Sequence, residues 1–217
     1  MTLSSLYKQN KIFFLGYFLL LIVAVFFWIF FSKANGFILL NPYHSKFLNV
    51  FFITITIMGD GIFSVVIGIL LFLFKKRFLA LMVFSSFAIS GILTQLIKMF
   101  ISEARPALFL AKDNYPYFIE NVTLHNFHSF PSGHSTSAFA LASILCFAVK
   151  NKKWSVVFLL AAALVGYSRI YLGQHFITDV AVGSIIAVLI SIFCWICFHK
   201  YFMRISAPQK EKDQVKS

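Results

Sequence analysis

The sequence predicts an all-α integral membrane bundle, and three observations support this fold class. Of the 217 residues, 60% are hydrophobic and only 12% are charged, with a mean hydropathy of +0.86. Apolar runs of membrane-span length recur along the chain, and basic residues cluster in short stretches between them. A soluble domain of this size could not cover so much apolar surface, so the expected solvent is a lipid bilayer. We expect one membrane domain over residues 1–206 and a polar C-terminal tail over 207–217.

Six transmembrane helices are expected from the apolar runs. The second run contains Gly59-Asp60-Gly61 and is longer than one crossing needs, so its first part is expected to be interfacial or re-entrant. The fourth run is short for a full crossing. The runs cover residues 12–31, 47–74, 78–97, 134–149, 154–171 and 177–198.

The basic residues predict which way the bundle faces. If both termini are cytoplasmic, the short inner loops contain K-K-R at 75–77 and K-N-K-K at 150–153, and most basic residues lie inside. This asymmetry follows the positive-inside rule. The net charge of +12 is then explained by membrane orientation and by an anionic substrate, and no nucleic-acid partner is expected.

Three basic residues lie on the opposite, outer face, close to the ends of spans: Lys98, Arg105 and Arg169. A charge at membrane depth is costly and points by default to a functional site. Lys98 and Arg105 are seven residues apart, which places them two turns apart on one face if the helix continues. Pro106 discourages continuation beyond that point. Together the three cations suit a phosphate-like group, for which arginine offers bidentate geometry.

A histidine and an aspartate join Arg169 in the stretch S-R-I-Y-L-G-Q-H-F-I-T-D, residues 168–179. His175 and Asp179 are four residues apart, so on a helix they lie about 40° apart around the axis and their side chains meet. An aspartate bonded to one imidazole nitrogen leaves the other with a lone pair, as a nucleophile or base requires. Gly173 allows a turn, so that Arg169 ends one span, His175 begins the next, and both face one pocket.

The segment P-S-G-H, residues 131–134, is typical of a helix start. Ser132 is a favourable N-cap, and Pro131 prevents extension of the helix backwards. The amides of Ser132, Gly133 and His134 are expected to point outward at the positive end of the helix dipole, which makes an anion site. Glycine lets the backbone approach a phosphate oxygen closely.

The residues alone therefore indicate an anion site beside an oriented histidine on one membrane face. A carrier that binds a lipid phosphate or another anion without cleaving it is compatible with the cations. The pair His175 and Asp179 favours an enzyme, because a carrier has no need of an oriented nucleophile.

These three segments, taken together, resemble the signature of the type 2 phosphatidic acid phosphatase (PAP2) family. The resemblance rests on Lys98-x6-Arg105-Pro106, then 131–134, then Ser168-Arg169-x5-His175-x3-Asp179, and it covers about residues 78–199. It implies a six-helix membrane bundle with the core that this family shares with vanadate-dependent haloperoxidases. Haloperoxidases of that kind are soluble, so the apolar spans argue against that activity here.

The resemblance also implies a role for each residue. His175 would attack phosphorus and form a phosphohistidine, Asp179 would orient it, and His134 would protonate the leaving oxygen and then activate water. The phosphoryl oxygens would be held by Lys98, Arg105, Ser132, Gly133 and Arg169. No metal and no other cofactor is expected, because the cations take the part of magnesium.

The expected function is hydrolysis of a lipid phosphomonoester or pyrophosphate, with the bilayer and the lipid as partners. Phosphatidic acid, phosphatidylglycerol phosphate, undecaprenyl pyrophosphate and lipid A phosphate all suit a cationic pocket at the membrane face. A phosphotransferase that uses the same phosphohistidine is an alternative. The small size and short loops favour a bacterial inner membrane, with the site facing the periplasm or the outside. The sequence does not define the oligomeric state.

Three further polar residues are secondary candidates. Asp60 is interpreted as the cap of a re-entrant turn, with a place in the pocket as the alternative accessory role. His125 and His128 are interpreted as solvated loop histidines, with a role in substrate entry as the alternative.

Overall fold

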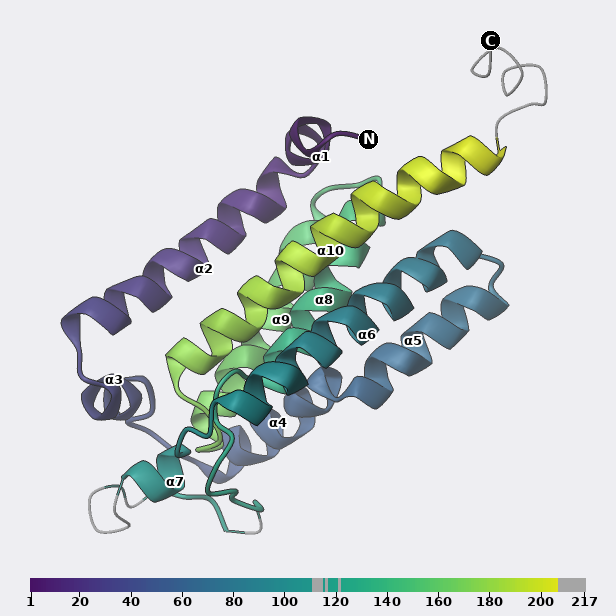
Figure 1. Ribbon diagram of the computed structural model, residues 1–217. Coiled ribbons are helices and arrows are strands. Elements are labelled where there is room, and N and C mark those ends of the chain that lie inside the picture. The colour runs from purple at the N-terminus through teal and green to yellow at the C-terminus, as the bar shows by residue number, and fades with distance from the viewer. Residues whose placement is uncertain (111–114, 116, 121, 207–217) are drawn as a thin grey trace.

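The computed structural model describes residues 1–110, 115, 117–120 and 122–206, and the expected tail over 207–217 lies outside them. Regular structure in this part of the chain is helical throughout (Figure 1). In chain order the elements are α1 (Leu3–Gln9), α2 (Lys11–Phe30), α3 (Lys33–Leu40), α4 (Lys46–Thr56), the 3-10 helix η1 (Ile57–Gly59), α5 (Gly61–Leu73), α6 (Arg77–Phe100), α7 (Pro106–Phe109), α8 (Gly133–Ala148), α9 (Trp154–Tyr171) and α10 (Ile177–Ser206).

The apolar helices match the expected runs, although the count of six spans stays a prediction. Within the described residues, α2, α6, α9 and α10 are each long and apolar enough to cross a membrane. The interrupted run forms α4, η1 and α5, which are bent by 56° and add a fifth span if they are taken together. The bend between η1 and α5 confirms the break expected at Gly59-Asp60-Gly61. α8 is apolar but has only 16 residues.

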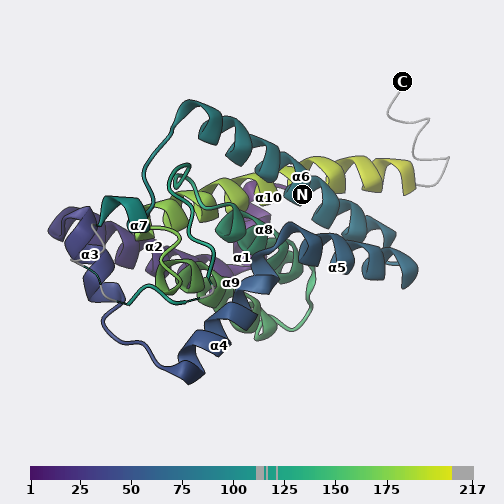
Figure 2. The same cartoon turned by 90° about the horizontal axis from the view of Figure 1, so that it is seen from below.

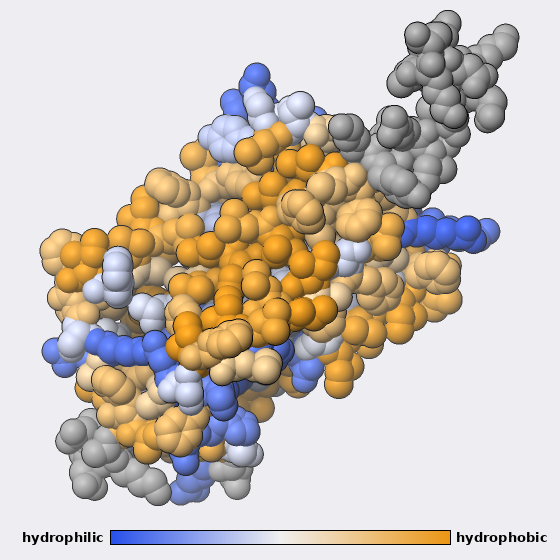
Figure 3. All heavy atoms as spheres, viewed as in Figure 1, coloured by the Kyte–Doolittle hydropathy of each residue, from blue (hydrophilic) through white to orange (hydrophobic). Residues whose placement is uncertain are grey.

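α8 forms the core of the bundle, and α6, α9 and α10 pack around it (Figures 1 and 2). Most of its side chains are buried, from Ser135 to Phe147. α2 is different, because only 11% of its most apolar window is buried. Large apolar side chains thus cover the middle of the face in Figure 3, and hydrophilic residues gather toward the two ends of the bundle. This surface suits lipid around the middle of the molecule.

Polar contacts join the packed helices. The hydroxyl groups of Ser86 and Ser191 lie 2.7 Å apart, between α6 and α10. Those of Thr94 and Thr136 lie 3.1 Å apart, between α6 and α8. Helices in lipid lack a hydrophobic force that drives them together, so small residues and hydrogen bonds of this kind contribute to their association.

The two ends of the bundle differ in character. At one end the N-terminal helix meets the α8–α9 turn and α10: Lys152 Nζ donates to Asn10 Oδ1 at 2.7 Å, and Trp195 Nε1 donates to Met1 Sδ at 3.3 Å. The basic α5–α6 turn, residues 74–76, lies at this end as well (Figure 1). The other end carries α3, α7, the long α6–α8 connection and the α9–α10 turn. The expected site residues gather there.

Candidate active site

The turn between α9 and α10 brings Arg169 and His175 to the same end of the bundle. Gly173 has a φ of +67°, a left-handed conformation that other residues adopt at a cost. The carbonyl of Arg169 accepts from the amides of Gln174 and His175, at 2.9 and 3.1 Å. The turn expected at Gly173 is therefore confirmed, and hydrogen bonds lock it.

His175 is backed by a buried carboxylate. His175 Nδ1 lies 3.5 Å from Asp179 Oδ2, and the two side chains are only 3% and 0% exposed. The same oxygen accepts from the Ser129 hydroxyl at 2.5 Å and from the Phe176 amide at 3.0 Å. At 3.5 Å the imidazole contact is long for a hydrogen bond, as catalytic pairs often are before substrate binds.

The environment of His175 favours the neutral imidazole. Burial lowers the pKa of His175 below its ordinary 6.5, and this effect outweighs that of the Asp179 carboxylate, which raises it. The imidazole is then neutral at pH 7. With the Nδ1 hydrogen assigned toward Asp179, Nε2 carries a lone pair.

The start of α8 forms the second part of the site. Ser132 is the N-cap, as expected, and its Oγ accepts from the Ser135 amide at 3.3 Å. The expectation that the Ser132 amide points outward is wrong, because this N–H donates to the Asp179 carbonyl at 3.0 Å. Gly133 faces open space, since a Cβ built there meets nothing within 4 Å. The amides of Gly133 and His134 belong to the first helical turn and have no carbonyl partner within it.

Lys98 and Arg105 reach the site from a chain that leaves the helix between them. α6 ends at Phe100, so the two residues do not share one continuous helical face. Lys98 Nζ donates to the His128 carbonyl at 2.7 Å, and Arg105 Nη1 donates to Gln174 Oε1 at 2.9 Å. Loop carbonyls and a side-chain amide thus fix cations that a helix was expected to align.

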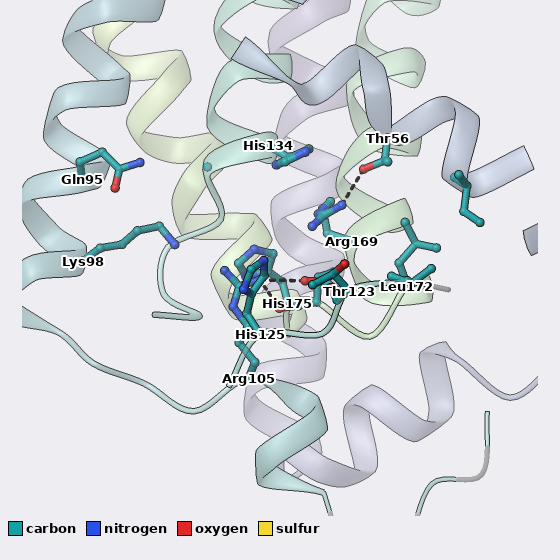
Figure 4. A pocket seen from close by; sticks show the side chains of 14 residues that line it. Thr56, Gln95, Lys98, Arg105, Thr123, His125, His134, Arg169, Leu172 and His175 are labelled. Carbon is teal, nitrogen blue, oxygen red and sulfur yellow. Dashed lines mark hydrogen bonds between the residues drawn. The ribbon is translucent and has the colours of Figure 1, made fainter. Parts of the chain in front are cut away.

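These groups line one cavity of about 430 Å³ (Figure 4). The cations Lys98, Arg105 and Arg169 enter it from three different segments, so an anion in the cavity would be contacted from several sides. Ser132 and Asp179 are buried beside the cavity, at 0% exposure each. The residues that line the cavity and were expected at the site are Lys98, Arg105, Gly133, His134, Arg169 and His175.

The secondary candidates fall in different places. Asp60 Oδ1 accepts from the Ile62 amide at 3.0 Å. Asp60 is therefore the N-cap of α5, which agrees with its interpretation as a turn cap. His125 lines the cavity. His128 Nδ1 lies 3.2 Å from the Lys98 carbonyl, which ties the loop to α6. In the part of the chain that the structure describes, no three His, Cys, Asp or Glu side chains gather as metal ligands.

Two residues that contact the candidate site were missed from the sequence. Ser129 contacts the catalytic candidate Asp179, and Gln174 holds Arg105 while its Nε2 donates to the Thr123 carbonyl at 3.0 Å. Position gave the only signal: Ser129 lies two residues before P-S-G-H, and Gln174 directly precedes His175.

An apolar groove adjoins the cavity. It has a volume of about 570 Å³, lies between α6 and the start of α8 with η1 and the first residue of α5 beside them, and shares Gln95, Gly133 and His134 with the polar cavity. Side chains such as Phe87 and Met99 line its remaining length. The site therefore combines a cationic pocket with an apolar extension along the bundle.

Comparison with known proteins gives one consistent family. The model of the PAP2 superfamily matches residues 78–203. The chain is 34% identical over 137 residues to phosphatidylglycerophosphatase B of Bacillus subtilis, covering 58% of this chain and 61% of the relative. It is 29% identical to lipid A 4'-phosphatase of Porphyromonas gingivalis, covering 75% of this chain and 71% of the relative. The chain thus spans about three fifths to seven tenths of these curated relatives.

A solved structure extends the likeness to most of the fold. The crystal structure of the first transmembrane PAP2 type phosphatidylglycerolphosphate phosphatase from Bacillus subtilis is 27% identical, with a TM-score of 0.65, and the match covers 89% of this chain and 97% of the other. The matched family region contains α6, α8, α9 and most of α10, which carry Lys98, His134, Arg169 and Asp179. Because the family model matches more than half of the chain, the chain belongs to the PAP2 superfamily.

Proposed function

We propose that this membrane protein is a lipid phosphatase that forms a phosphohistidine on His175. One observation carries the proposal: a buried imidazole, held neutral and backed by Asp179, lines a cavity into which Lys98, Arg105 and Arg169 also project. The cations attract a phosphate monoester, and the neutral imidazole provides the lone pair that attacks it.

In the first step, His175 Nε2 forms a bond to phosphorus while the bond from phosphorus to the lipid oxygen breaks. His134 gives a proton to that oxygen, so the lipid leaves as an alcohol. Burial and the neighbouring cations lower the pKa of His134 to about 4, and a bound phosphate dianion offsets those cations, so His134 takes up this proton in the substrate complex. The Nδ1 hydrogen stays directed at Asp179, whose negative charge stabilises the cationic imidazole that phosphorylation creates.

In the second step, His134 is neutral and accepts a proton from water as the water oxygen attacks phosphorus. The bond from phosphorus to His175 breaks, inorganic phosphate forms, and both histidines return to their starting states. Charge on the transferring group would be stabilised by the three cations and by the amide of Gly133, which lines the cavity at the positive end of the α8 dipole. The hydroxyl of Ser132, buried beside the cavity, accepts from Ser135 and has no acceptor for its own hydrogen in the described residues, so it would add a further donor. The cations supply the positive charge that a metal ion provides in other phosphoryl-transfer enzymes.

The apolar groove between α6 and the start of α8 supports a lipid as the substrate. A phosphate in the cavity places its alcohol group near Gln95 and His134, where the groove begins. A lipid chain would follow the groove without leaving the apolar phase. The names of the relatives, phosphatidylglycerophosphatase and lipid A 4'-phosphatase, favour an envelope lipid phosphate over a soluble ester.

The proposed location is a bacterial inner membrane with the site facing the periplasm. The basic turn at 74–76, Lys152 and the N-terminal helix share one end of the bundle, and the site lies at the other. The positive-inside rule places the basic end in the cytoplasm. Single substitutions Asn151→Cys and Tyr117→Cys, each in a cysteine-free background, test this. A membrane-impermeant maleimide added to intact spheroplasts should label the variant at 117 only, and the reverse pattern would invert the orientation.

The activity test compares phosphate release by wild type, His175→Ala and His199→Ala in detergent. The substrates are phosphatidylglycerol phosphate, lipid A phosphate, phosphatidic acid and undecaprenyl pyrophosphate. His199 packs against Phe78 on α6 and is a control for loss of a histidine away from the cavity. Wild type and His199→Ala should release phosphate, and His175→Ala should fall by roughly 1,000-fold or more.

Other outcomes would identify the alternatives. If wild type releases no inorganic phosphate but converts an added second lipid alcohol into its phosphate ester, the protein is a phosphotransferase. If wild type binds the lipids without turnover and His175→Ala binds them equally well, the protein is a carrier of lipid phosphates and the phosphatase proposal is wrong.

A further inference from the structure

The broken helix pair α4–α5 contributes a residue to the phosphate cavity from outside the matched family region. Thr56 is the last residue of α4, directly before η1, and the family match begins only at residue 78. Thr56 is half-buried and lines the same cavity as Arg169 and His134. Figure 4 shows its hydroxyl directed at Arg169, across the cavity from Lys98.

Thr56 holds the most buried of the three cations. Arg169 Nη1 donates to Thr56 Oγ1 at 2.8 Å. Arg169 is 9% exposed, and its Nε has no hydrogen-bond partner in the described part of the chain. A buried guanidinium with unused donors is costly to leave alone, so it favours a phosphate oxygen as its missing partner.

The hydrogen-bond inventory leaves Thr56 one donor. A guanidinium can only donate, so the oxygen of Thr56 is the acceptor and its hydroxyl hydrogen remains available. Helical threonines often donate this hydrogen to the carbonyl four residues earlier, as Thr54 Oγ1 does to the Val50 carbonyl at 2.9 Å. For Thr56, the described residues show no such bond. Its hydrogen is therefore free to point into the cavity.

We propose that Thr56 is a further phosphate-binding residue of this enzyme. Its oxygen fixes the Arg169 guanidinium, and its hydroxyl hydrogen donates to a phosphoryl oxygen that the same guanidinium binds. This inference rests on the proposed function, since it assigns a ligand to the group that His175 attacks. It gives the bent α4–α5 segment a chemical role in addition to its passage through the membrane.

The test uses three variants and two readouts. Thr56→Val removes the hydroxyl at nearly constant volume, Thr56→Ser keeps it, and Thr54→Val makes the same chemical change at an exposed position of the same helix. Orthovanadate, which resembles the phosphoryl group in transfer, is titrated by calorimetry into each protein in detergent. Phosphate release from the preferred lipid gives kcat and KM in parallel.

Thr56→Val should weaken vanadate binding about 10- to 100-fold, the range for a hydrogen bond to a charged group, and should lower kcat/KM by a similar factor. Thr56→Ser should keep vanadate affinity within about threefold, and Thr54→Val should match wild type. Equal affinity of Thr56→Val and wild type would overturn the proposal. An equal loss in Thr56→Val and Thr56→Ser would also overturn it, because packing of the methyl group would then explain the effect.

The two readouts separate this inference from the proposed function. If wild type binds vanadate but releases no phosphate from any lipid, the phosphatase proposal fails, and a selective loss of vanadate binding in Thr56→Val still supports Thr56 as an anion ligand. If wild type neither binds vanadate nor releases phosphate, both proposals fail. If it releases phosphate without binding vanadate, the phosphatase proposal stands, and an unchanged kcat/KM in Thr56→Val overturns the role of Thr56.

Discussion

Ser129 donates a 2.5 Å hydrogen bond to Oδ2 of Asp179, the carboxylate oxygen that faces the imidazole of His175. Both Ser129 and Asp179 are completely buried. A buried carboxylate needs donors to remain charged, and Ser129 supplies one from the loop before α8. We therefore expect Ser129 to act as a positioning residue for His175, through Asp179.

Replacing Ser129 with alanine should lower kcat by about tenfold or more with little change in KM, because the carboxylate loses a charge-assisted hydrogen bond but the cations still hold the substrate. Steady-state phosphate release measures this. Ser143→Ala is the matched control, since Ser143 is equally buried on α8 and donates to the Phe139 carbonyl at 2.6 Å. Equal losses of kcat in the two variants would mean that Ser129 matters only for folding.

Gly59 should be needed for the position of His134. A Cβ at residue 59 would lie 2.5 Å from Val165 Cγ1 and 3.0 Å from His134 Cβ, closer than packed atoms allow. Gly59→Ala should therefore displace the α8 start, reduce kcat several-fold, and cost about 1–3 kcal/mol of stability. Phosphate release and the thermal unfolding midpoint in detergent measure the two effects.

Two further variants interpret the Gly59 result. Adding Val165→Ala removes the nearest obstacle and should restore part of the activity. Gly36→Ala is the control, because a Cβ there makes only ordinary contacts, at 3.6 Å or more, and Gly36 lies on α3 outside the cavity and the groove. Full activity in Gly59→Ala would show that His134 tolerates the displacement.

Acid should destabilise the protein through His175. Burial lowers the pKa of His175 in the folded state, so below pH 6.5 the unfolded chain binds more protons than the folded one. The stabilising contribution is complete above pH 6.5 and is lost as pH falls, by up to about 1.4 kcal/mol per pH unit. The thermal midpoint of wild type should thus fall more steeply between pH 7 and pH 5 than that of His175→Asn. Parallel slopes would show that His175 does not titrate differently on unfolding.

Phosphatase activity should persist in EDTA. The positive charge at the cavity comes from Lys98, Arg105 and Arg169, which a chelator cannot remove. Phosphate release before and after dialysis against EDTA measures this, with magnesium added back as the control. Loss of activity that magnesium restores would contradict the assignment of the charge to these side chains.

Local signals made the α9–α10 turn and the cap of α8 predictable from the sequence. Gly173 marks the reversal, the spacing of His175 and Asp179 follows the helix period, and Ser132 has the chemistry of an N-cap. Each feature depends on neighbours within a few residues. The structure agrees with the sequence at Gly173 and Ser132. His175 and Asp179 also meet, but α10 begins at Ile177, so His175 precedes the helix and the two residues do not share a helical face as expected.

The remaining features depend on contacts between distant segments. α6 stops before Arg105 because the following chain pairs with the loop that precedes α8, through the Arg105 amide and the Asn126 carbonyl at 2.9 Å. Thr56 meets Arg169 across 113 residues of sequence. No periodicity or capping pattern reports such pairs, so the sequence could place the three cations on one face but not identify what holds them.

The short length of α8 has a consequence for the depth at which chemistry takes place. Its 16 residues extend about 24 Å, which is ~6 Å less than the thickness of the hydrocarbon layer. If the lysines that follow α8 anchor its far end at the polar boundary, Gly133 and His134 lie beneath the level of the surrounding head groups. The phosphate of the lipid would then bind below the level of the head groups, in a depression that water enters. Hydrolysis would take place at that depth, and the lipid would not have to leave the bilayer.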